Sequence, residues 1–180
     1  RNKDDYYLLY NPDILIVHIG IVDLYPRPYP NNIFTRLLKK LLRIFYIDID
    51  AILKKCKLYY KLGDLFNFTE VSFRNYKKYY IELIKTNPDK IIICIGFVKP
   101  SKILSRSKRF LSKVEMYNNF IKSLCDNQRI FYIDLFELNE EYTIWDGYHF
   151  NEKSSEFIYC NIVNIINREN VWFRPKNFIS

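Results

Sequence analysis

Glycine and proline are scarce in this chain, which has only 4 glycines and 7 prolines among 180 residues. A loop-rich or repeat architecture needs many of both, and no internal repeat or low-complexity segment is present. The sequence also lacks a glycine-rich phosphate loop and a Gly-x-Gly-x-x-Gly motif. We therefore expect neither a repeat protein nor a nucleotide-binding protein.

Metal-binding and membrane-spanning patterns are missing as well. The four cysteines (Cys56, Cys94, Cys125 and Cys160) form no Cys-x-x-Cys pair, and the chain has only 2 histidines. Buried free thiols in a reducing compartment explain these cysteines better than a zinc site or a disulfide framework does. Cys94 lies in an apolar run, and Cys160 is expected on the inner face of a helix. No run of about 18 apolar residues occurs, so we expect no membrane span. We also expect no metal, no cofactor and a cytoplasmic location.

Apolar and basic residues, by contrast, are abundant. Hydrophobic residues make up 49% and aromatic residues 18% of the chain, which predicts a folded protein, and the length suits a single domain over 1–180. The formal charge is +8, with basic clusters at 36–43 and 99–113. Such basic runs can bind phosphates or an anionic membrane surface. Because leucines alternate with them at helical spacing, we expect instead that the basic residues form the solvated faces of helices. A nucleic-acid-binding domain rests on charge alone, so no nucleic-acid partner is expected.

The periodicity of apolar residues predicts the fold class. Near-continuous apolar runs at 14–19, 91–95 and 130–135 are typical of strands covered on both faces. Helical spacing predicts helices over 33–45, 70–86, 111–125 and 152–167, and 46–67 is less regular, with a short helix or an excursion near the site. The alternation predicts an α/β fold, a parallel sheet flanked by helices.

The segment Asp146-Gly147-Tyr148-His149 carries the strongest chemical signal. A general base needs an imidazole with one available ring nitrogen, and a carboxylate that fixes its tautomer, and an Asp-x-x-His loop can supply either part. The alternative is a surface turn, bent at Gly147, that leads into a helix capped by Asn151. His149 is thus a candidate catalytic base or a capping residue, and Asp146 is its partner or a cap of the turn.

Ligands of parallel α/β sheets bind outside the carboxyl ends of the strands. The loops at 20–27 and 96–101 and the loop carrying His149 are therefore expected at one edge of the sheet. In the first loop, Gly20 and Asp23 are candidate site residues, Asp23 holding the loop through backbone N–H groups. Arg27 either meets an anionic substrate group or is solvated. His18, within an apolar run, is expected to be a core histidine bonded to backbone.

Three segments resemble blocks of the SGNH/GDSL hydrolases. Residues 12–23, Pro-Asp-Ile-Leu-Ile-Val-His-Ile-Gly-Ile-Val-Asp, resemble the third block, in which a buried strand runs into Gly-x-Asn-Asp. Residues 146–151 resemble the fifth block, Asp-x-x-His followed by a helix, and 115–120 lie where many members have a Tyr-Asn pair. The resemblance implies a flavodoxin-like three-layer sandwich and a cofactor-free serine esterase or acyl hydrolase. Its substrate would be a small acyl ester or an acylated carbohydrate, with Gly20, Asp23 and Arg27 at the oxyanion side of the site.

The chain departs from this family at two points. The Gly-Asp-Ser block with the nucleophile is missing, so the sequence resembles a member that lacks its first strand and helix, and we do not assign Ser72, Ser101 or Ser154 as nucleophile. Val22 stands where the family has an oxyanion-hole asparagine, and valine donates no hydrogen bond. The alternative function is therefore a non-catalytic relative or fragment with the same fold that serves a binding or structural role.

Overall fold

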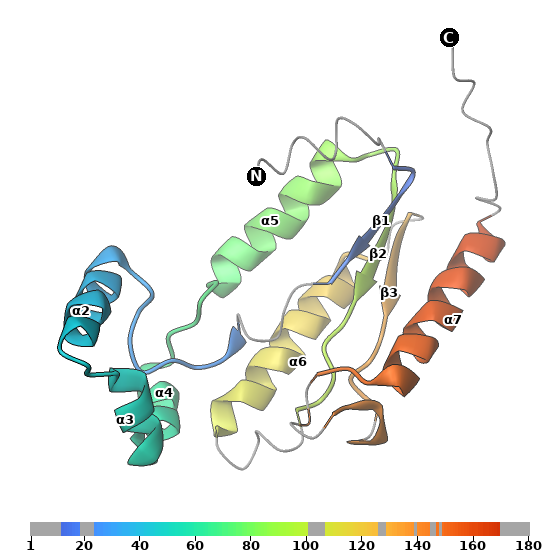
Figure 1. Cartoon of the computed structure of the whole chain (residues 1–180). Coiled ribbons are helices and arrows are strands. Elements are labelled where there is room, and N and C mark those ends of the chain that lie inside the picture. The colour runs from blue at the N-terminus through green and yellow to red at the C-terminus, as the bar shows by residue number, and fades with distance from the viewer. Residues whose placement is uncertain are drawn as a thin grey trace, which may run out of the picture.

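Three parallel strands form a small sheet at the centre of the structure (Figure 1). The computed structural model describes residues 12–18, 24–100, 107–125, 129–138, 140–144, 147 and 149–169. The strands β1 (Ile14–Val17), β2 (Ile91–Ile95) and β3 (Ile130–Ile133) lie in the order β1-β2-β3. Ile14 lies opposite Ile91, and Ile92 lies opposite Ile130. The parallel sheet confirms the α/β prediction, although β1 and β3 each end two residues earlier than expected.

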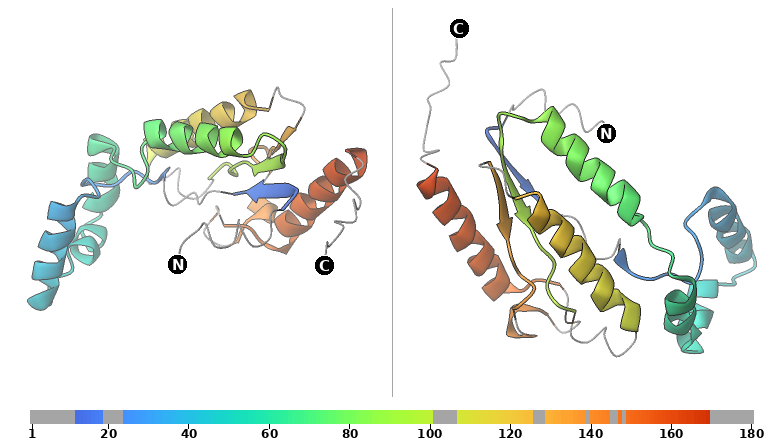
Figure 2. Two further views of the ribbon diagram at one scale, coloured as in Figure 1. Left: turned by 90° about the horizontal axis from the view of Figure 1, so that it is seen from above. Right: turned by 180° about the vertical axis from the view of Figure 1, so that it is seen from behind.

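Helices cover both faces of this sheet, as predicted. Figure 2 shows α5 and α6 on one face and α7 on the other. The helices of the described residues are α2 (Ile33–Ile44), α3 (Ile49–Lys55), α4 (Leu58–Phe66), α5 (Phe73–Thr86), α6 (Lys108–Ser123) and α7 (Glu152–Arg168), with a 3-10 turn η2 (Glu140–Tyr142) before α7. No described helix is long and apolar enough to cross a membrane.

The central strand β2 is apolar without alternation because both of its faces are covered. Ile92 and Cys94 belong to the core beneath α5 and α6, whereas Ile93 and Ile95 belong to the core beneath α7. All four are at most 6% exposed, because successive side chains of a strand point to opposite faces and both faces are covered. The expected burial of Cys94 is therefore confirmed.

Aromatic rings fill much of the core between the sheet and the two helices α5 and α6. Tyr76, Tyr80 and Tyr117 are each 1% exposed, and the ring of Tyr76 lies 4.8 Å from that of Tyr80 and 4.5 Å from that of Tyr117. The helical spacing of Tyr76 and Tyr80 places both on one face of α5. These large rings fix the position of both helices on the sheet.

The three helices α2, α3 and α4 project away from the sheet as what we call the helical arm, residues 31–68 (Figure 1). Tyr46, Lys57 and Asn67 adopt left-handed backbone conformations, with φ of 58°, 56° and 58°, at the ends of its helices. Gly63 of α4 packs against the chain that follows β1, where an added Cβ would lie 2.6 Å from the carbonyl oxygen of Pro26. The arm is therefore seated on the loop after β1.

The structure bears on two expectations about helix faces. The basic cluster at 36–43 was expected to form a solvated helix face, and Arg36, Lys40 and Arg43 are exposed on α2. No residue of α2 is buried, however, and Leu37 and Leu41 are also 55% and 56% exposed. Cys160 was expected on the inner face of its helix and is exposed on α7. Apolar periodicity identifies a face of a helix but does not reveal what covers it.

Candidate active site

The loop between β3 and α7 is folded back on itself at the carboxyl edge of the sheet. Thr143 and Phe150 form an antiparallel bridge, and the N–H of Ile144 donates to the carbonyl of His149 at 3.0 Å. The N–H of Gly147 donates to the carbonyl of Ile144 at 2.9 Å, and Gly147 has a φ of 78°. This left-handed conformation suits glycine, which has no Cβ, so the glycine of the Asp-x-x-His segment makes the turn as expected.

A capping box fixes the chain directly after His149. The side chain of Asn151 accepts from the N–H of Ser154 at 3.2 Å, and the hydroxyl of Ser154 accepts from the N–H of Asn151 at 3.1 Å. The Ser154 hydroxyl also donates to the carbonyl of Tyr142. The expected N-cap role of Asn151 is confirmed, and these bonds hold the loop and the first turn of α7 together.

His149 is exposed, and it lies two residues before this N-cap. The ring of its neighbour Phe150 packs against the ring of His18, which follows β1, with 5.0 Å between centroids. The loop of His149 therefore meets the carboxyl end of β1, which is the edge on which the sequence predicted a site. The structure leaves the catalytic role of His149 a prediction.

His18 is the residue whose environment differs most from expectation. It is exposed directly after β1 instead of buried in the core, because the strand ends at Val17, the residue before it. Its ring lies 6.4 Å from that of Phe97, and desolvation by its neighbours lowers the pKa of His18, while a hydrogen bond to the backbone of Ile95 raises it. The expected backbone bond is present, and the second histidine of the chain stands at the same edge as the first.

The carboxyl end of β2 is held by an asparagine of α6. The N–H of Phe97 donates to Oδ1 of Asn118 at 2.8 Å, and Nδ2 of Asn118 donates to the carbonyl of Phe97 at 2.9 Å. Asn118 is 5% and Phe97 1% exposed, so the paired bonds are shielded from water. Asn118 is part of the Tyr-Asn pair of the family resemblance, and its structural task is to fix this strand end.

Gly96, immediately before Phe97, leaves room for an aromatic side chain. An added Cβ would collide with the Tyr132 ring, whose Cζ would lie 2.8 Å away. Tyr132 belongs to β3, so the glycine at the end of β2 lets the neighbouring strand carry a large ring. Burial raises the pKa of the Tyr132 hydroxyl above its ordinary value.

Arg27 is held at the base of the helical arm. The guanidinium of Arg27 lies 2.8 Å from Oε2 of Glu70, and the backbone N–H of Arg27 donates to the carbonyl of Phe68 at 2.7 Å. The other oxygen of Glu70 accepts from Nδ2 of Asn31. Arg27 therefore joins both ends of the arm, and a role in binding an anionic substrate remains a prediction.

Several predicted positions lie outside the described residues, namely Gly20, Val22, Asp23, Ser101 and Asp146. Of the serines that we did not assign as nucleophile, Ser72 is the N-cap of α5 and Ser154 belongs to the capping box of α7. Both are occupied in helix capping.

Sequence reasoning missed the exposed His18, although a polar residue at the end of an apolar run is a signal for a strand end at a site edge. In the part of the chain that the structure describes, no group of three or more His, Cys, Asp or Glu is placed to hold a metal ion.

Comparison with known proteins adds no family assignment, since no protein-family model and no curated protein matches the sequence.

Proposed function

We propose that the chain is an SGNH-type serine esterase or acyl hydrolase that acts on a small O-acyl ester, such as an acylated carbohydrate. His149 is the general base, and Asp146 orients its imidazole. The observation that carries the proposal is the position of the His149 loop, which is pinned by the α7 capping box and reaches the carboxyl end of β1. The role of Asp146 rests on the resemblance of 146–151 to the fifth block of the family.

In this mechanism His149 takes the proton of a serine hydroxyl as the serine attacks the ester carbonyl, and it returns that proton to the leaving alcohol. The resulting acyl-enzyme is hydrolysed by water that His149 activates in turn. In the family that the chain resembles, this serine belongs to a Gly-Asp-Ser block that comes before the block resembled by residues 12–23. No cofactor takes part in this chemistry.

The alternative function, a non-catalytic relative or fragment with a binding or structural role, is supported by the hydrogen bonds of the described serines. Besides the two capping serines, Ser107 is buried and donates to Asp64, and the hydroxyls of Ser112 and Ser123 donate to carbonyls of their own helix. Ser155 donates in the same way to the carbonyl of Asn151. Each of these hydroxyls thus has a structural hydrogen bond.

A hydrolysis assay separates the two functions. A longer form of the protein with a Gly-Asp-Ser block before Arg1 is expected to hydrolyse nitrophenyl acetate, and the 180 residues alone are not. His149→Ala should lower the rate by about 10²–10⁴-fold, the usual contribution of a general base. The substitution leaves the backbone bond between Ile144 and His149 in place, so the loop is retained.

Glu156→Gln is the matched control, because Glu156 is exposed on α7, one turn beyond the cap. It should leave the rate unchanged. An active extended protein whose rate does not respond to His149→Ala would show that the mechanism is wrong. A folded extended protein without esterase activity would favour the non-catalytic alternative.

A further inference from the structure

The helix α2 has its apolar face turned outward. At 3.6 residues per turn, residues 33, 34, 37, 38, 41, 44 and 45 fall on one half of the helix, and the basic residues fall on the other. The outward half is exposed: Ile33 76%, Phe34 74%, Leu37 55%, Leu38 43%, Leu41 56%, Ile44 64% and Phe45 71%. A surface helix of a globular protein ordinarily shows the opposite arrangement.

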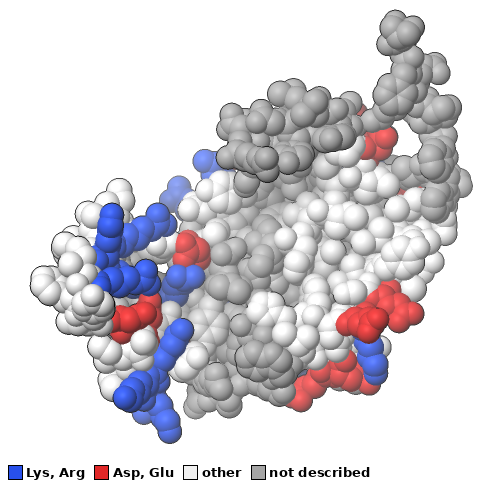
Figure 3. Space-filling view, in the orientation of Figure 1, with Lys and Arg blue, Asp and Glu red and all other residues white. Residues whose placement is uncertain are grey.

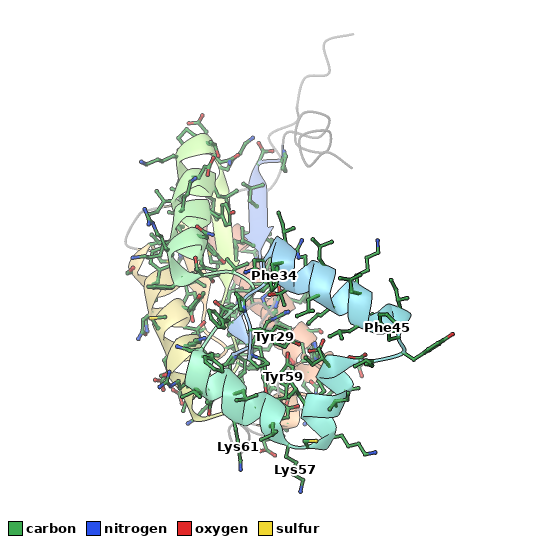
Figure 4. The ribbon with its side chains drawn as sticks, turned by 90° about the vertical axis from the view of Figure 1, so that its left-hand side faces the viewer. Tyr29, Phe34, Phe45, Lys57, Tyr59 and Lys61 are labelled. Atoms are coloured by element: carbon green, nitrogen blue, oxygen red, sulfur yellow. The ribbon has the colours of Figure 1, made fainter. Side chains whose placement is uncertain are left out.

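The polar half of α2 makes the contacts with the rest of the arm. Nζ of Lys39 lies 2.9 Å from Oδ2 of Asp50 on α3 and 4.1 Å from the ring centroid of Tyr29. Desolvation lowers the pKa of Lys39 and raises that of Asp50. Figure 4 shows Tyr29 and Tyr59 between α2 and α4, and their rings are 6.5 Å apart in an edge-on arrangement. The inner side of the arm thus includes Tyr29, Tyr59 and the Lys39–Asp50 ion pair, and these contacts hold α2 with its apolar face outward.

The exposed face is too large to be incidental. Seven large apolar residues at these exposures form a patch on the order of 700 Å², whereas the largest patch on a typical monomer is about 300–600 Å². The face belongs to a convex helix. Tyr46, which is 99% exposed, follows it at the end of α2.

Positive charge is concentrated in the segment that carries this patch. Residues 33–66 contain eight Lys or Arg and three acidic residues. All three acidic side chains are engaged within the protein, since Asp48 caps α3, Asp50 pairs with Lys39, and Asp64 accepts from Ser107. Figure 3 shows Lys and Arg gathered over the helical arm. Lys57 and Lys61 extend from the opposite side of the arm in Figure 4.

We infer that the helical arm docks on an anionic lipid surface, with the apolar face of α2 inserted among the headgroups. Interfacial helices combine an apolar face rich in Phe and Leu with basic residues on the polar side, and they bind anionic bilayers through both. A bilayer accepts a convex helix without a complementary groove. This docking is independent of the proposed ester hydrolysis.

Charge argues against a second copy of the chain as the occupant. Two arms packed face to face would bring together two surfaces that both carry Lys40 and Arg43 at or near the patch, with no unengaged carboxylate in the described arm to offset them. Like charges in close contact disfavour association. Anionic headgroups neutralise the same residues.

Vesicle co-sedimentation of the whole chain tests the inference. Vesicles of equal parts phosphatidylcholine and phosphatidylglycerol should bind the protein at least about tenfold more tightly than vesicles of phosphatidylcholine alone, and added salt should weaken the binding. Leu37→Gln with Leu41→Gln should weaken it by about tenfold or more, because two apolar side chains leave the patch. Both residues are exposed, and glutamine has a helix propensity close to that of leucine, so the fold is retained.

The matched control is Met116→Gln with Tyr159→Gln, which removes apolar side chains that are 40% and 66% exposed on α6 and α7. It should bind as the unaltered protein does. In Phe34→Trp, the emission that remains after subtraction of the spectrum of the unaltered protein, which has two tryptophans, should shift to the blue on anionic vesicles and so report insertion of the face.

Three results would overturn the inference. These are equal binding to both kinds of vesicle, equal loss in the control and the leucine variant, or an unshifted tryptophan spectrum on bound vesicles. The face would instead bind a second copy of the chain if the protein does not bind vesicles but forms dimers, and if Leu37→Gln with Leu41→Gln dissociates these dimers.

Discussion

Replacing Asn118 by alanine should destabilise the protein by about 2–5 kcal/mol. The side chain makes two hydrogen bonds to Phe97, of 2.8 and 2.9 Å, in a region that is almost completely buried. Alanine leaves the N–H and the carbonyl of Phe97 without these partners, and each buried polar group left unsatisfied costs about 1–3 kcal/mol. Since small proteins are stable by about 5–15 kcal/mol, this is a large share of the total.

Urea unfolding measures the effect, with Asn119→Ala as the control. Asn119 is the next residue of α6 and is exposed, so its substitution should change the free energy of unfolding by no more than about 0.5 kcal/mol. Both substitutions gain the same helix propensity, which cancels when the two variants are compared. With a denaturant slope of about 2 kcal/mol/M, the midpoint of Asn118→Ala should lie about 1–2.5 M below that of the control.

The reasoning would be refuted by Asn118→Ala and Asn119→Ala variants with the same midpoint. Such a result would mean that the end of β2 does not depend on α6. A second readout comes from the ring of His18, which lies 6.4 Å from that of Phe97. Its proton resonances should move in Asn118→Ala and stay in place in the control.

Further expectations concern one glycine, one lysine and one strand. Gly63→Ala should lower the thermal midpoint, because its Cβ would lie 2.6 Å from a backbone oxygen of the loop after β1. Burial, with repulsion from Arg109, lowers the pKa of Lys113 from 10.5 to about 8. Between these two pH values the unfolded chain binds more protons than the folded protein, so the free energy of unfolding should rise with pH. NMR titration should find the lowered pKa, and Lys113→Met should remove this contribution to the pH dependence of stability. On β1, Leu15→Thr should cost about 2–4 kcal/mol and Ile16→Thr less than about 1 kcal/mol in urea unfolding, since Leu15 is 7% and Ile16 is 53% exposed. Equal costs at the two positions would show that the outer face of β1 is covered in solution.

The sheet could be predicted because its signal is local. β2 matches the predicted run at both ends, since it is the central strand and each of its residues pairs with β1, with β3 or with both. The outer strands end early, where their ladders to β2 stop at Val17 and Ile133. An apolar run shows that a strand is buried, whereas its length is set by the partner strand, which lies far away in the sequence.

The helical arm could not be predicted in the same way. Its turns place Tyr46, Lys57 and Asn67 in left-handed conformations. The chain has only 4 glycines, and neither tyrosine at 46 nor lysine at 57 indicates in the sequence that a helix ends or begins there. Only asparagine is commonly found in this region among these three. The outward face of α2 also has a periodicity identical to that of a buried helix, so the pattern alone indicated the helix but not its orientation.

Arg27 is a predicted site residue and also holds the base of the arm, so an effect of its substitution has two interpretations. The family resemblance places Arg27 at the oxyanion side of the site, while the structure shows it clamped to Glu70 and bridged to Phe68 at the base of the arm. A loss of activity in Arg27→Ala would therefore arise either from the substrate site or from release of the arm. Glu70→Gln distinguishes these causes, because it removes the ion pair from the arm and leaves the guanidinium in the loop. If Arg27 serves the substrate, Glu70→Gln should retain activity that Arg27→Ala loses, and if Arg27 serves the arm, both substitutions should have the same effect.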